Sequence, residues 1–434
     1  MSLLRWLKRA KPGTLIAVGF ASVIGIGTVL LLLPWAANPG VTVSVVDALF
    51  TATSAVCVTG LLVVDTADTF NVFGRTVVAL LIQIGGLGVT SIGVGAILLA
   101  GKRVGMKGRM LVRDALNLEN MKGIVKLVKA IFITTLIFEG IGAMLSYTVF
   151  AQDYPPLEAM GVSIFHAIAA FNNAGFDVLG GMRNLAPYQN NPLLLLTTCG
   201  LIIFGGLGFL TISEMAYKRS FKKMSLHGKS VILTTLFLLI GGMVLLKIAQ
   251  PSCTWLHAFF YSTSSRTAGF SVGSLMTMSH SFLFILCILM FIGASPGSTG
   301  GGIKPTTVFT IYRSVCSMAT NQPCGAFKRS ISDEVVHKAY VIMALAAFIV
   351  CVGTLGMCML EPNIAFLPLL FEVISAFGTV GLSTGITPTL SAGGKLIIIM
   401  TMFIGRIGPL TVVTLWSFNQ KKKVNYTEET ISIG

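Results

Sequence analysis

The sequence predicts an all-α polytopic membrane protein, and three observations carry this prediction. The chain has 434 residues, of which 54% are hydrophobic and only 11% are charged, whereas soluble domains carry about 25% charged residues. Apolar runs long enough to cross a bilayer recur from one end of the chain to the other. Shorter semi-polar segments, each of which ends in a glycine, lie between pairs of these runs.

Eight apolar runs have about the 20 residues that an α-helix needs to cross the hydrocarbon core. They are Leu15–Trp35, Val72–Ala100, Ile124–Phe150, Leu193–Tyr217, Val231–Ile248, Phe282–Ile311, Tyr340–Leu360 and Leu396–Ser417. Basic residues precede the first run, but that run is too long for a signal peptide and no small-residue cleavage site closes it. We therefore expect eight transmembrane helices.

Four shorter segments are too rich in Ser, Thr and Asn for full spans: Val45–Thr59, Ala159–Ala174, Trp255–Ala268 and Phe366–Val380. If each enters the membrane and returns, 24 of the 31 Lys and Arg fall on one face, in the two termini and in residues 101–129, 218–229 and 313–338. Lys and Arg are retained on the cytoplasmic side. We therefore expect re-entrant segments, cytoplasmic termini and four parallel repeats, 1–122, 123–226, 227–330 and 331–434, the last with a C-terminal tail.

The four short segments share a pattern. Each ends in a glycine that has a Phe ten residues earlier and a large apolar residue directly after it; these glycines are Gly60, Gly175, Gly269 and Gly381. A second set of glycines follows 24 to 30 residues later, in the next apolar run: Gly85, Gly205, Gly293 and Gly405. Glycine in membrane helices often only permits close packing, but packing alone does not account for four aligned copies.

Non-helical backbone at membrane depth is tolerated where it lines a wet cavity or is buried in protein. Four such loops around one axis would form a central pore whose backbone carbonyls replace the water shell of an ion, as in a potassium filter. The loops hold no acid, and the negative C-terminal ends of the short helices would favour cations. The candidate ion-binding residues are Val58, Thr59, Gly60, Asn173, Ala174, Gly175, Thr267, Ala268, Gly269, Thr379, Val380 and Gly381.

The loop sequences resemble those of the bacterial Ktr/Trk/HKT potassium-transporter superfamily, most closely its KtrB membrane subunits. The similar motifs are Thr-Gly-Leu at 59–61, Ala-Phe-Asn-Asn-Ala-Gly-Phe at 170–176, Arg-Thr-Ala-Gly-Phe at 266–270 and Ser-Ala-Phe-Gly-Thr-Val-Gly-Leu at 375–382. The resemblance implies potassium uptake across the bacterial cytoplasmic membrane, one pore per subunit, a homodimer within membrane lipid, and a cytoplasmic nucleotide-binding regulatory ring of the KtrA type. Some plant relatives with Ser in the first loop transport sodium, so Gly60 implies selectivity for potassium.

The third inner run contains a Gly-rich stretch with Pro296, which cannot continue a stable helix. We expect a flexible gating loop beneath the filter, since only this repeat has such a break; the alternative is a packing kink. The family has an intramembrane gating loop at this position. The candidate gating residues are Gly293, Ser295, Gly297, Ser298, Thr299, Gly300, Gly301, Gly302, Lys304 and Arg406.

Ionisable residues at membrane depth are costly and are functional by default. We expect Arg406 to face the pore, to set a barrier under the filter and to contact the gating loop; the alternative is an ion pair with Glu139. Arg266 is expected to brace the filter from behind, because a cation in the ion path would repel potassium. Glu372 and His166 are expected to serve as scaffold.

Other classes fit less well. The stretch Gly293–Gly297 matches G-x-S-x-G, but a membrane span lacks the strand-turn-helix context of that motif, so we expect no enzyme and no organic cofactor. The net charge of +15 comes mainly from Lys and Arg that we expect on the cytoplasmic face, so it does not indicate a nucleic-acid partner. The remaining alternative is a sodium-coupled or sodium-conducting secondary cation transporter, which would show inverted repeats and broken spans at paired positions.

Overall fold

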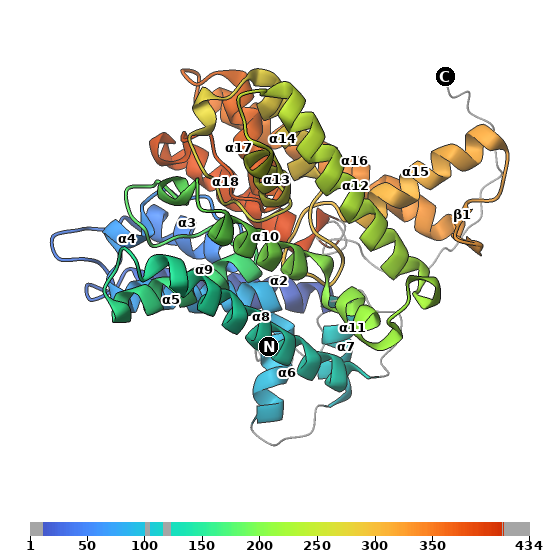
Figure 1. Cartoon of the computed structure of the whole chain (residues 1–434), viewed down its shortest axis with the longest axis horizontal. Coiled ribbons are helices and arrows are strands. Elements are labelled where there is room, and N and C mark those ends of the chain that lie inside the picture. Colours follow the sequence, from blue (N-terminus) through green and yellow to red (C-terminus); the bar gives the residue numbers. More distant parts are fainter. Residues whose placement is uncertain (1–11, 100–104, 116–122, 410, 412–434) are drawn as a thin grey trace, which may run out of the picture.

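The computed structural model describes residues 12–99, 105–115, 123–409 and 411, which form a bundle of α-helices (Figure 1). In chain order the helices fall into four groups. The first is α2 (Pro12–Leu31), α3 (Val45–Val56), α4 (Thr66–Thr69), α5 (Val72–Leu87), α6 (Val89–Leu99) and α7 (Met106–Ala115). The second is α8 (Ile124–Phe150), α9 (Pro156–Phe171), η1 (Ala186–Tyr188), α10 (Pro192–Leu207), α11 (Phe209–Lys218) and η2 (Phe221–Lys223).

The third group is α12 (Leu226–Ala249), α13 (Trp255–Ser264), η3 (Leu275–Thr277), α14 (His280–Phe291) and α15 (Pro305–Thr320). A small antiparallel hairpin of β1 (Gly325–Ala326) and β2 (Arg329–Ser330) follows. The last group is α16 (Asp333–Leu360), α17 (Phe366–Gly378), η4 (Thr387–Thr389) and α18 (Ala392–Ile407). Each group therefore begins with a long apolar helix, continues with a short helix and a loop, and returns through a further helix.

Polar caps define where many of these apolar helices begin. The side chains of Ser44, Asn71, Asn191, Ser279 and Ser391 each accept a backbone N–H of the first helical turn. Such a cap satisfies one of the N–H groups that a helix start leaves unpaired. The sequence thus sets the start of α3, α5, α10, α14 and α18 by a single polar residue ahead of an apolar run.

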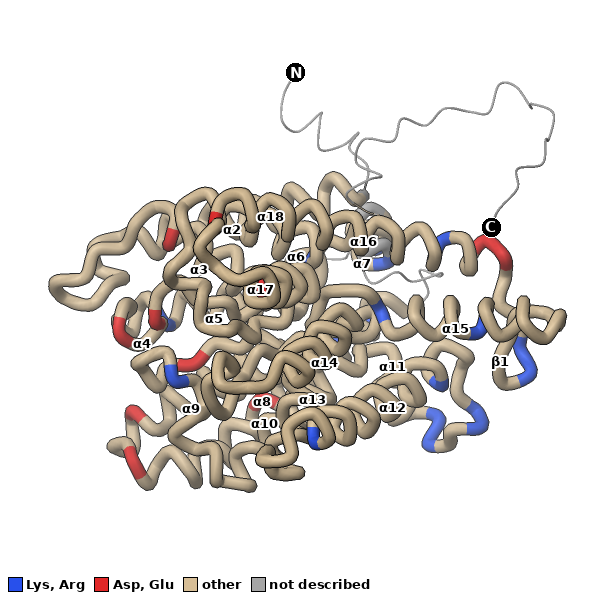
Figure 2. Tube along the Cα trace, turned by 90° about the horizontal axis from the view of Figure 1, so that it is seen from above, with Lys and Arg blue, Asp and Glu red and all other residues tan. Residues whose placement is uncertain are grey.

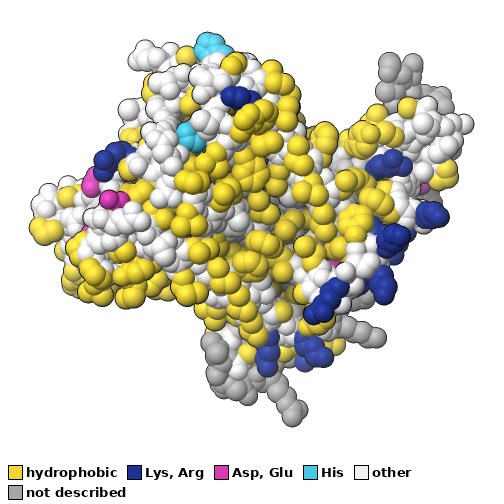
Figure 3. Space-filling view, in the orientation of Figure 1, with side chains coloured by type: hydrophobic (Ala, Val, Ile, Leu, Met, Phe, Trp, Pro, Cys, Tyr) yellow, Lys and Arg dark blue, Asp and Glu magenta, His cyan; other side chains and the backbone are white. Residues whose placement is uncertain are grey.

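The long and short helices differ in burial. Most residues of α3, α9, α13 and α17 are buried. The long helices instead expose large apolar side chains, among them Leu136 of α8, Phe237 of α12 and Phe348 of α16, each about two-thirds exposed or more. Hydrophobic side chains accordingly cover much of the surface in Figure 3. An apolar surface of this extent suits contact with lipid.

Among the described residues, three helical stretches are long and apolar enough to cross a bilayer: Gly13–Leu31, Leu226–Ala249 and Asp333–Leu360. The number rises to five if the bent pairs α5–α6 and α10–α11 are each counted as one span. The C-terminal part of the last predicted run, residues 412–417, lies outside the described residues.

The expectation that only the third inner run is broken was wrong. The axis bends by 96° between α5 and α6 and by 94° between α10 and α11. Both bends lie at glycines with positive φ, Gly88 at 83° and Gly208 at 85°, a conformation that ends a helix at little cost only for glycine. The third run is interrupted between Phe291 and Pro305, so the predicted spans 72–100, 193–217 and 282–311 are not continuous helices.

Charged residues separate along the molecule (Figure 2). Lys and Arg gather around the end of α11, the start of α12, α15 and the β-hairpin, whereas many acids lie at the opposite end, around α3 and α4. The predicted basic residues of the N-terminus (1–11), of 101–104 and 116–122, and of the C-terminus (412–434) lie outside the described residues.

Candidate functional site

The four predicted loops follow the C-terminal ends of α3, α9, α13 and α17, and their backbones have the same unusual shape. The residue two before each glycine has positive φ: Val58 57°, Asn173 59°, Thr267 69° and Thr379 50°. The glycines themselves have φ between 66° and 97°. For a β-branched residue such as Val58 this conformation is strained, and strain of this kind concentrates at functional sites.

Each loop is tied back to its own helix by the residue before the glycine. The backbone N–H groups of Thr59, Ala174 and Val380 donate to the carbonyls of Ser54, Ala169 and Ser375, each at 2.8 Å. The third loop differs slightly: the N–H groups of Ala268 and Gly269 both donate to Ser264 O, at 2.9 and 3.3 Å. Every loop is therefore anchored to the end of its own helix, although the acceptor of the third is one position further along.

The loops meet one another in a closed ring. The Cα of each glycine lies against the backbone carbonyl that precedes the glycine of the next loop, so that an added Cβ would come within 3.0 Å of that oxygen. The pairs are Gly60 with Ala174, Gly175 with Ala268, Gly269 with Val380, and Gly381 with Thr59. The contacts run through the loops in chain order and return from the fourth to the first.

Four carbonyl oxygens in this ring have no hydrogen-bond donor among the described residues. Thr59, Ala174, Ala268 and Val380 are all fully buried, yet none of their carbonyls accepts a hydrogen bond from any residue that the structure describes. Buried carbonyls are nearly always paired. A ring of unpaired carbonyls has the donor set that replaces the water shell of a potassium ion, so the residues present fit that ion as cargo.

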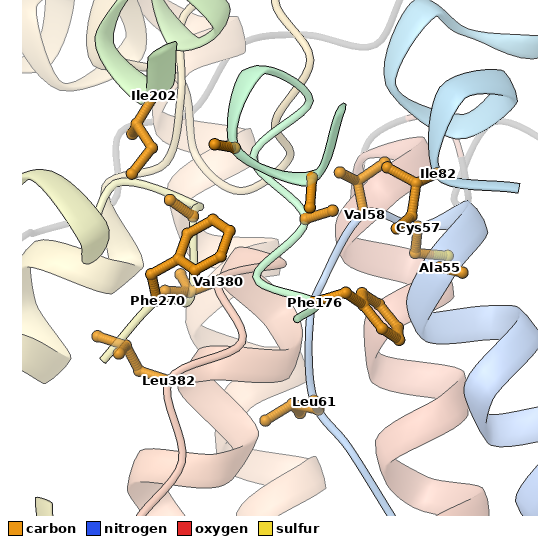
Figure 4. Packing of buried hydrophobic residues seen from close by; sticks show 14 of the residues in the cluster. Ala55, Cys57, Val58, Leu61, Ile82, Phe176, Ile202, Phe270, Val380 and Leu382 are labelled. Carbon is orange, nitrogen blue, oxygen red and sulfur yellow. The ribbon is translucent and has the colours of Figure 1, made fainter. Parts of the chain in front are cut away.

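The residues directly after the glycines pack around the ring. Leu61, Phe176, Phe270 and Leu382, drawn in Figure 4, are fully buried or nearly so. Hydroxyl groups add support: Ser54 Oγ accepts from the Gly60 N–H at 3.1 Å, and Ser375 Oγ accepts from the Gly381 N–H at 3.0 Å. Buried apolar side chains and hydrogen bonds from the preceding helices therefore hold the ring in place.

The two ends of the segment predicted as a gating loop are hydrogen-bonded to each other, and the segment lies against the ring. Ile292 and Ile303 form a parallel bridge, and the Gly293 N–H donates to Ile303 O at 2.8 Å. The Gly301 N–H donates to Thr379 Oγ1, in the fourth loop, at 2.9 Å. On the side of the second group, the Ser295 N–H donates to Gly206 O at 3.0 Å.

Arg406 joins this segment to the first group of helices. Its guanidinium donates to the carbonyls of Thr299 and Gly85. The alternative ion pair with Glu139 is not among the interactions of the described residues, since Glu139 accepts from Gln83 and Asn172. Lys304 Nζ donates to Gly300 O at 3.0 Å, within the same segment. Both cations thus hold carbonyls of the segment.

A cavity of about 530 Å³ lies beside the segment. Its wall includes Gly300, Lys304 and Arg406, together with residues of α2, α15 and α16. Ser295 Oγ and Ser298 Oγ of the segment are buried without a partner among the described residues. The segment therefore lies between the ring and this cavity.

The predicted scaffold residues lie behind the loops. Arg266 Nη2 donates to Gly293 O at 3.4 Å, and His166 Nε2 and Thr198 Oγ1 lie 2.9 Å apart. Glu372, fully buried, accepts from the hydroxyls of Ser383 and Thr387. No cluster of three or more His, Cys, Asp or Glu that could hold a metal occurs in the described part of the chain.

Sequence reasoning missed a contact on the other side of the ring. Asn184 Nδ2 donates to Gly175 O and to Asp177 Oδ2, each at 3.2 Å, and Asn184 Oδ1 accepts from the N–H of Ser271, just past the third loop. Burial raises the pKa of Asp177 to about 6. The position of Asp177 two residues after Gly175 was the one signal in the sequence.

Comparisons with known proteins give relatives over the whole chain. The family model of TrkH, described as a cation transport protein, matches residues 8–250 and 231–426. The Ktr system potassium uptake protein B of Bacillus subtilis is 39% identical over 444 residues, covering 100% of this chain and 98% of that protein. The potassium/sodium uptake protein NtpJ of Enterococcus hirae is 38% identical over 444 residues, covering 98% of each.

Among solved structures, the potassium transporter TrkH from Vibrio parahaemolyticus has a similar fold. The TM-score is 0.74 at 18% sequence identity, and the match covers 94% of this chain and 86% of that one. At this identity the likeness concerns the fold alone.

Proposed function

The chain belongs to the TrkH family of cation transport proteins, and from that membership we propose that it takes up potassium ions through the ring of four loops. The observation that carries the proposal is the set of four buried, unpaired carbonyls of Thr59, Ala174, Ala268 and Val380. A desolvated potassium ion on the ring axis would supply the positive charge that these oxygens lack. The Bacillus subtilis relative, which is named a potassium uptake protein, supports this choice of ion.

The same proposal includes the architecture. Eight spans form four parallel repeats, 1–122, 123–226, 227–330 and 331–434, and each contributes one loop to the pore. The recurring order of long helix, buried short helix and return helix supports it, as does the separation of basic from acidic residues (Figure 2). By the positive-inside rule we propose that the basic end faces the cytoplasm, and the Lys and Arg of the two terminal sequences favour the same side for both termini.

We assign the gate to the segment 293–302 with Lys304 and Arg406. Its hydrogen bonds to Thr379 of the fourth loop and to Gly206 of α10 hold it beside the ring, where it would block an ion leaving the ring. The positive charge of Arg406 would add a barrier for cations at the same place. Movement of this segment would then connect the ring with the cavity of about 530 Å³.

Two partners belong to the proposal: a second copy of the chain in the bilayer, and a cytoplasmic nucleotide-binding ring of the KtrA type. The name of the Bacillus relative, protein B of a Ktr system, supports a second component. The basic surface around α11, α12 and the β-hairpin is where it would bind (Figures 2 and 3).

A sodium-coupled or sodium-conducting transporter is the second candidate. Two observations favour keeping it: the relative NtpJ is named a potassium/sodium uptake protein, and the return helices of the first two groups are both broken, at Gly88 and Gly208. Paired breaks occur in secondary transporters. Gly60, where a serine would press its Cβ against the Ala174 carbonyl and distort the ring, favours potassium.

Uptake into liposomes tests the proposal. Purified protein is reconstituted, and the initial uptake of K⁺ and of Na⁺ is measured with and without the other ion outside. The proposal expects K⁺ uptake that clearly exceeds Na⁺ uptake and does not require Na⁺. Uptake of K⁺ only in the presence of Na⁺ would favour the second candidate, and no K⁺ uptake at all would overturn both.

A further inference from the structure

A polar cluster of buried Asn172 and partly buried Gln83 and Glu139 lies behind the second loop and joins three helices. Asn172, at the end of α9, donates through Nδ2 to Gln83 Oε1 of α5 at 2.8 Å and to Glu139 Oε1 of α8 at 3.0 Å. Gln83 Nε2 in turn donates to Glu139 Oε2 at 3.3 Å. Both carboxyl oxygens of Glu139 therefore accept a hydrogen bond, each from the side-chain amide of a different helix.

The surroundings of Glu139 make its presence costly. It lies in the middle of α8, between Leu136, Ile137 and Ile141, whose side chains are about half exposed or more and suit contact with lipid. An ionisable side chain at membrane depth is retained where it has a function. No cation pairs with Glu139 among the described residues, so its two amide partners are what hold it.

Phe138, the residue before Glu139, packs against Phe171, the residue before Asn172. The Phe138 ring stacks on Phe171, with centroids 5.8 Å apart, and on Phe204 of α10, with centroids 4.5 Å apart. Two consecutive residues of α8 thus hold the last two residues ahead of the loop, Phe171 by stacking and Asn172 by hydrogen bonds. Asn173, Ala174 and Gly175 of the ring follow directly.

The third loop has a contact of the same kind. Arg266 stands three residues before Gly269, as Asn172 stands three before Gly175. Its guanidinium donates to a backbone carbonyl outside its own loop, that of Gly293, at 3.4 Å. The side chain at this position therefore fixes the loop to the protein behind it in two of the four loops.

We propose that Glu139 is a positioning residue for ion selectivity: it holds Asn172, and through Asn172 the carbonyl of Ala174, where the second loop completes the ring. The inference rests on the proposed function of that ring. Without the carboxyl group the Asn172 amide loses a partner, and the loop gains freedom to adjust to a smaller ion. Selectivity should then fall before transport is lost.

The test compares Glu139→Leu with Glu139→Gln in liposomes, using the ratio of K⁺ to Na⁺ uptake. Gln keeps an oxygen that accepts from Asn172 and loses only the acceptor for the Gln83 amide, so the ratio should stay within about twofold of wild type. Leu removes both acceptors, and the ratio should fall about fivefold or more, with increased Na⁺ uptake. Thr135→Val is the matched control: Thr135 lies one turn earlier in α8, is buried, and its hydroxyl has no partner among the described residues.

The selectivity ratio separates positioning from simple structural support. If Glu139→Leu slows K⁺ and Na⁺ uptake equally, or leaves both unchanged, the inference is overturned. Should that variant fail to fold, Gln83→Leu removes one partner and keeps the carboxyl group; it should lower the ratio in the same direction, and an unchanged ratio would overturn the inference. A wild-type protein with no preference for K⁺ would instead refute the proposed function, which is a different result.

Discussion

The carbonyl oxygen of Thr59, in the first loop, lies directly against the Cα of Gly381, in the last loop. This contact closes the ring, since the other three pairs link loops that are consecutive in the chain. The four unpaired carbonyls consequently surround one axis instead of lining an open groove. Every pair depends on a glycine, because a side chain would take the space that the neighbouring carbonyl occupies.

Serine at either end of this closure should reduce selectivity. Gly60→Ser and Gly381→Ser place a Cβ against a backbone carbonyl of the neighbouring loop, at positions with φ of 84° and 97°. We expect the ring to widen or distort, and the K⁺ to Na⁺ uptake ratio to fall about tenfold, equivalent to about 1.4 kcal/mol of discrimination.

The control for these variants is Gly161→Ser. Gly161 lies on α9, and nothing lies within 4 Å of an added Cβ there. It should keep the wild-type ratio. A wild-type K⁺ to Na⁺ uptake ratio in both Gly60→Ser and Gly381→Ser would show that the ring does not lie in the ion path.

Two substitutions of Arg406 distinguish a contact that holds the gating segment closed from a positive charge that repels cations. Arg406→Gln removes the charge and the two-carbonyl contact to Thr299 and Gly85, whereas Arg406→Lys keeps the charge but lacks the planar fork that reaches both carbonyls. If the contact holds the segment closed, both variants should raise K⁺ flux in liposomes several-fold. If the charge alone limits flux, only Arg406→Gln should do so. Wild-type flux in both would contradict the gate.

The ion pair of Lys395 with Asp47 should stabilise the closure. Lys395 Nζ lies 2.7 Å from Asp47 Oδ1, and the pair joins α18 to α3, so it links the last group of helices to the first. Both side chains are more than four-fifths buried. A double-mutant cycle with Lys395→Met and Asp47→Asn should give a coupling of about 1 kcal/mol in the free energy of unfolding. A coupling near zero would show that the pair adds nothing.

Asp177 should make stability depend on pH. Burial raises its pKa from 3.8 to about 6; the hydrogen bond from the Leu179 N–H opposes the shift, and Asp65 and Asp68 add to it. The folded protein therefore binds this proton more tightly than the unfolded chain. The stabilisation by protonated Asp177 is fully present below about pH 4 and is lost as the pH rises through about 6, with an upper limit of about 3 kcal/mol.

Thermal unfolding of the purified protein between pH 4 and 7 checks this prediction. Asp177→Asn cannot titrate, so its unfolding temperature should vary less with pH than that of wild type. Glu158→Gln, at an exposed acid near the start of α9, should keep the wild-type pH dependence. The same pH dependence in Asp177→Asn as in wild type would refute the assignment.

The sequence could identify the loops because their signal is local and repeated. Gly60, Gly175, Gly269 and Gly381 each stand ten residues after a Phe and 24 to 30 residues before a glycine of the second set, and this fourfold coincidence is visible without a structure. The second set also has a physical reason: Gly85, Gly205 and Gly405 lie against the carbonyls of Val56, Phe171 and Phe377, each in the short helix of the same group.

Other features could not be predicted, because their signals are not specific. Gly88 and Gly208 look like packing glycines in an apolar run, and only their backbone angles make them bends. The partners of Arg406 are the backbone carbonyls of Gly85 and Thr299, an acceptor that every residue carries. The sequence offers Glu139 as an alternative partner of Arg406, whereas the amides of Gln83 and Asn172 donate to Glu139 in the structure.

The central claim is that the carbonyls of Thr59, Ala174, Ala268 and Val380 coordinate the transported ion. Anomalous scattering from crystals grown in rubidium salt tests it most directly, because Rb⁺ replaces K⁺ and is located without reference to activity. We predict an anomalous peak on the ring axis, within coordination distance of these four oxygens, that disappears in sodium salt. A protein that takes up Rb⁺ but shows no peak there, or binds it at another place only, would contradict this account.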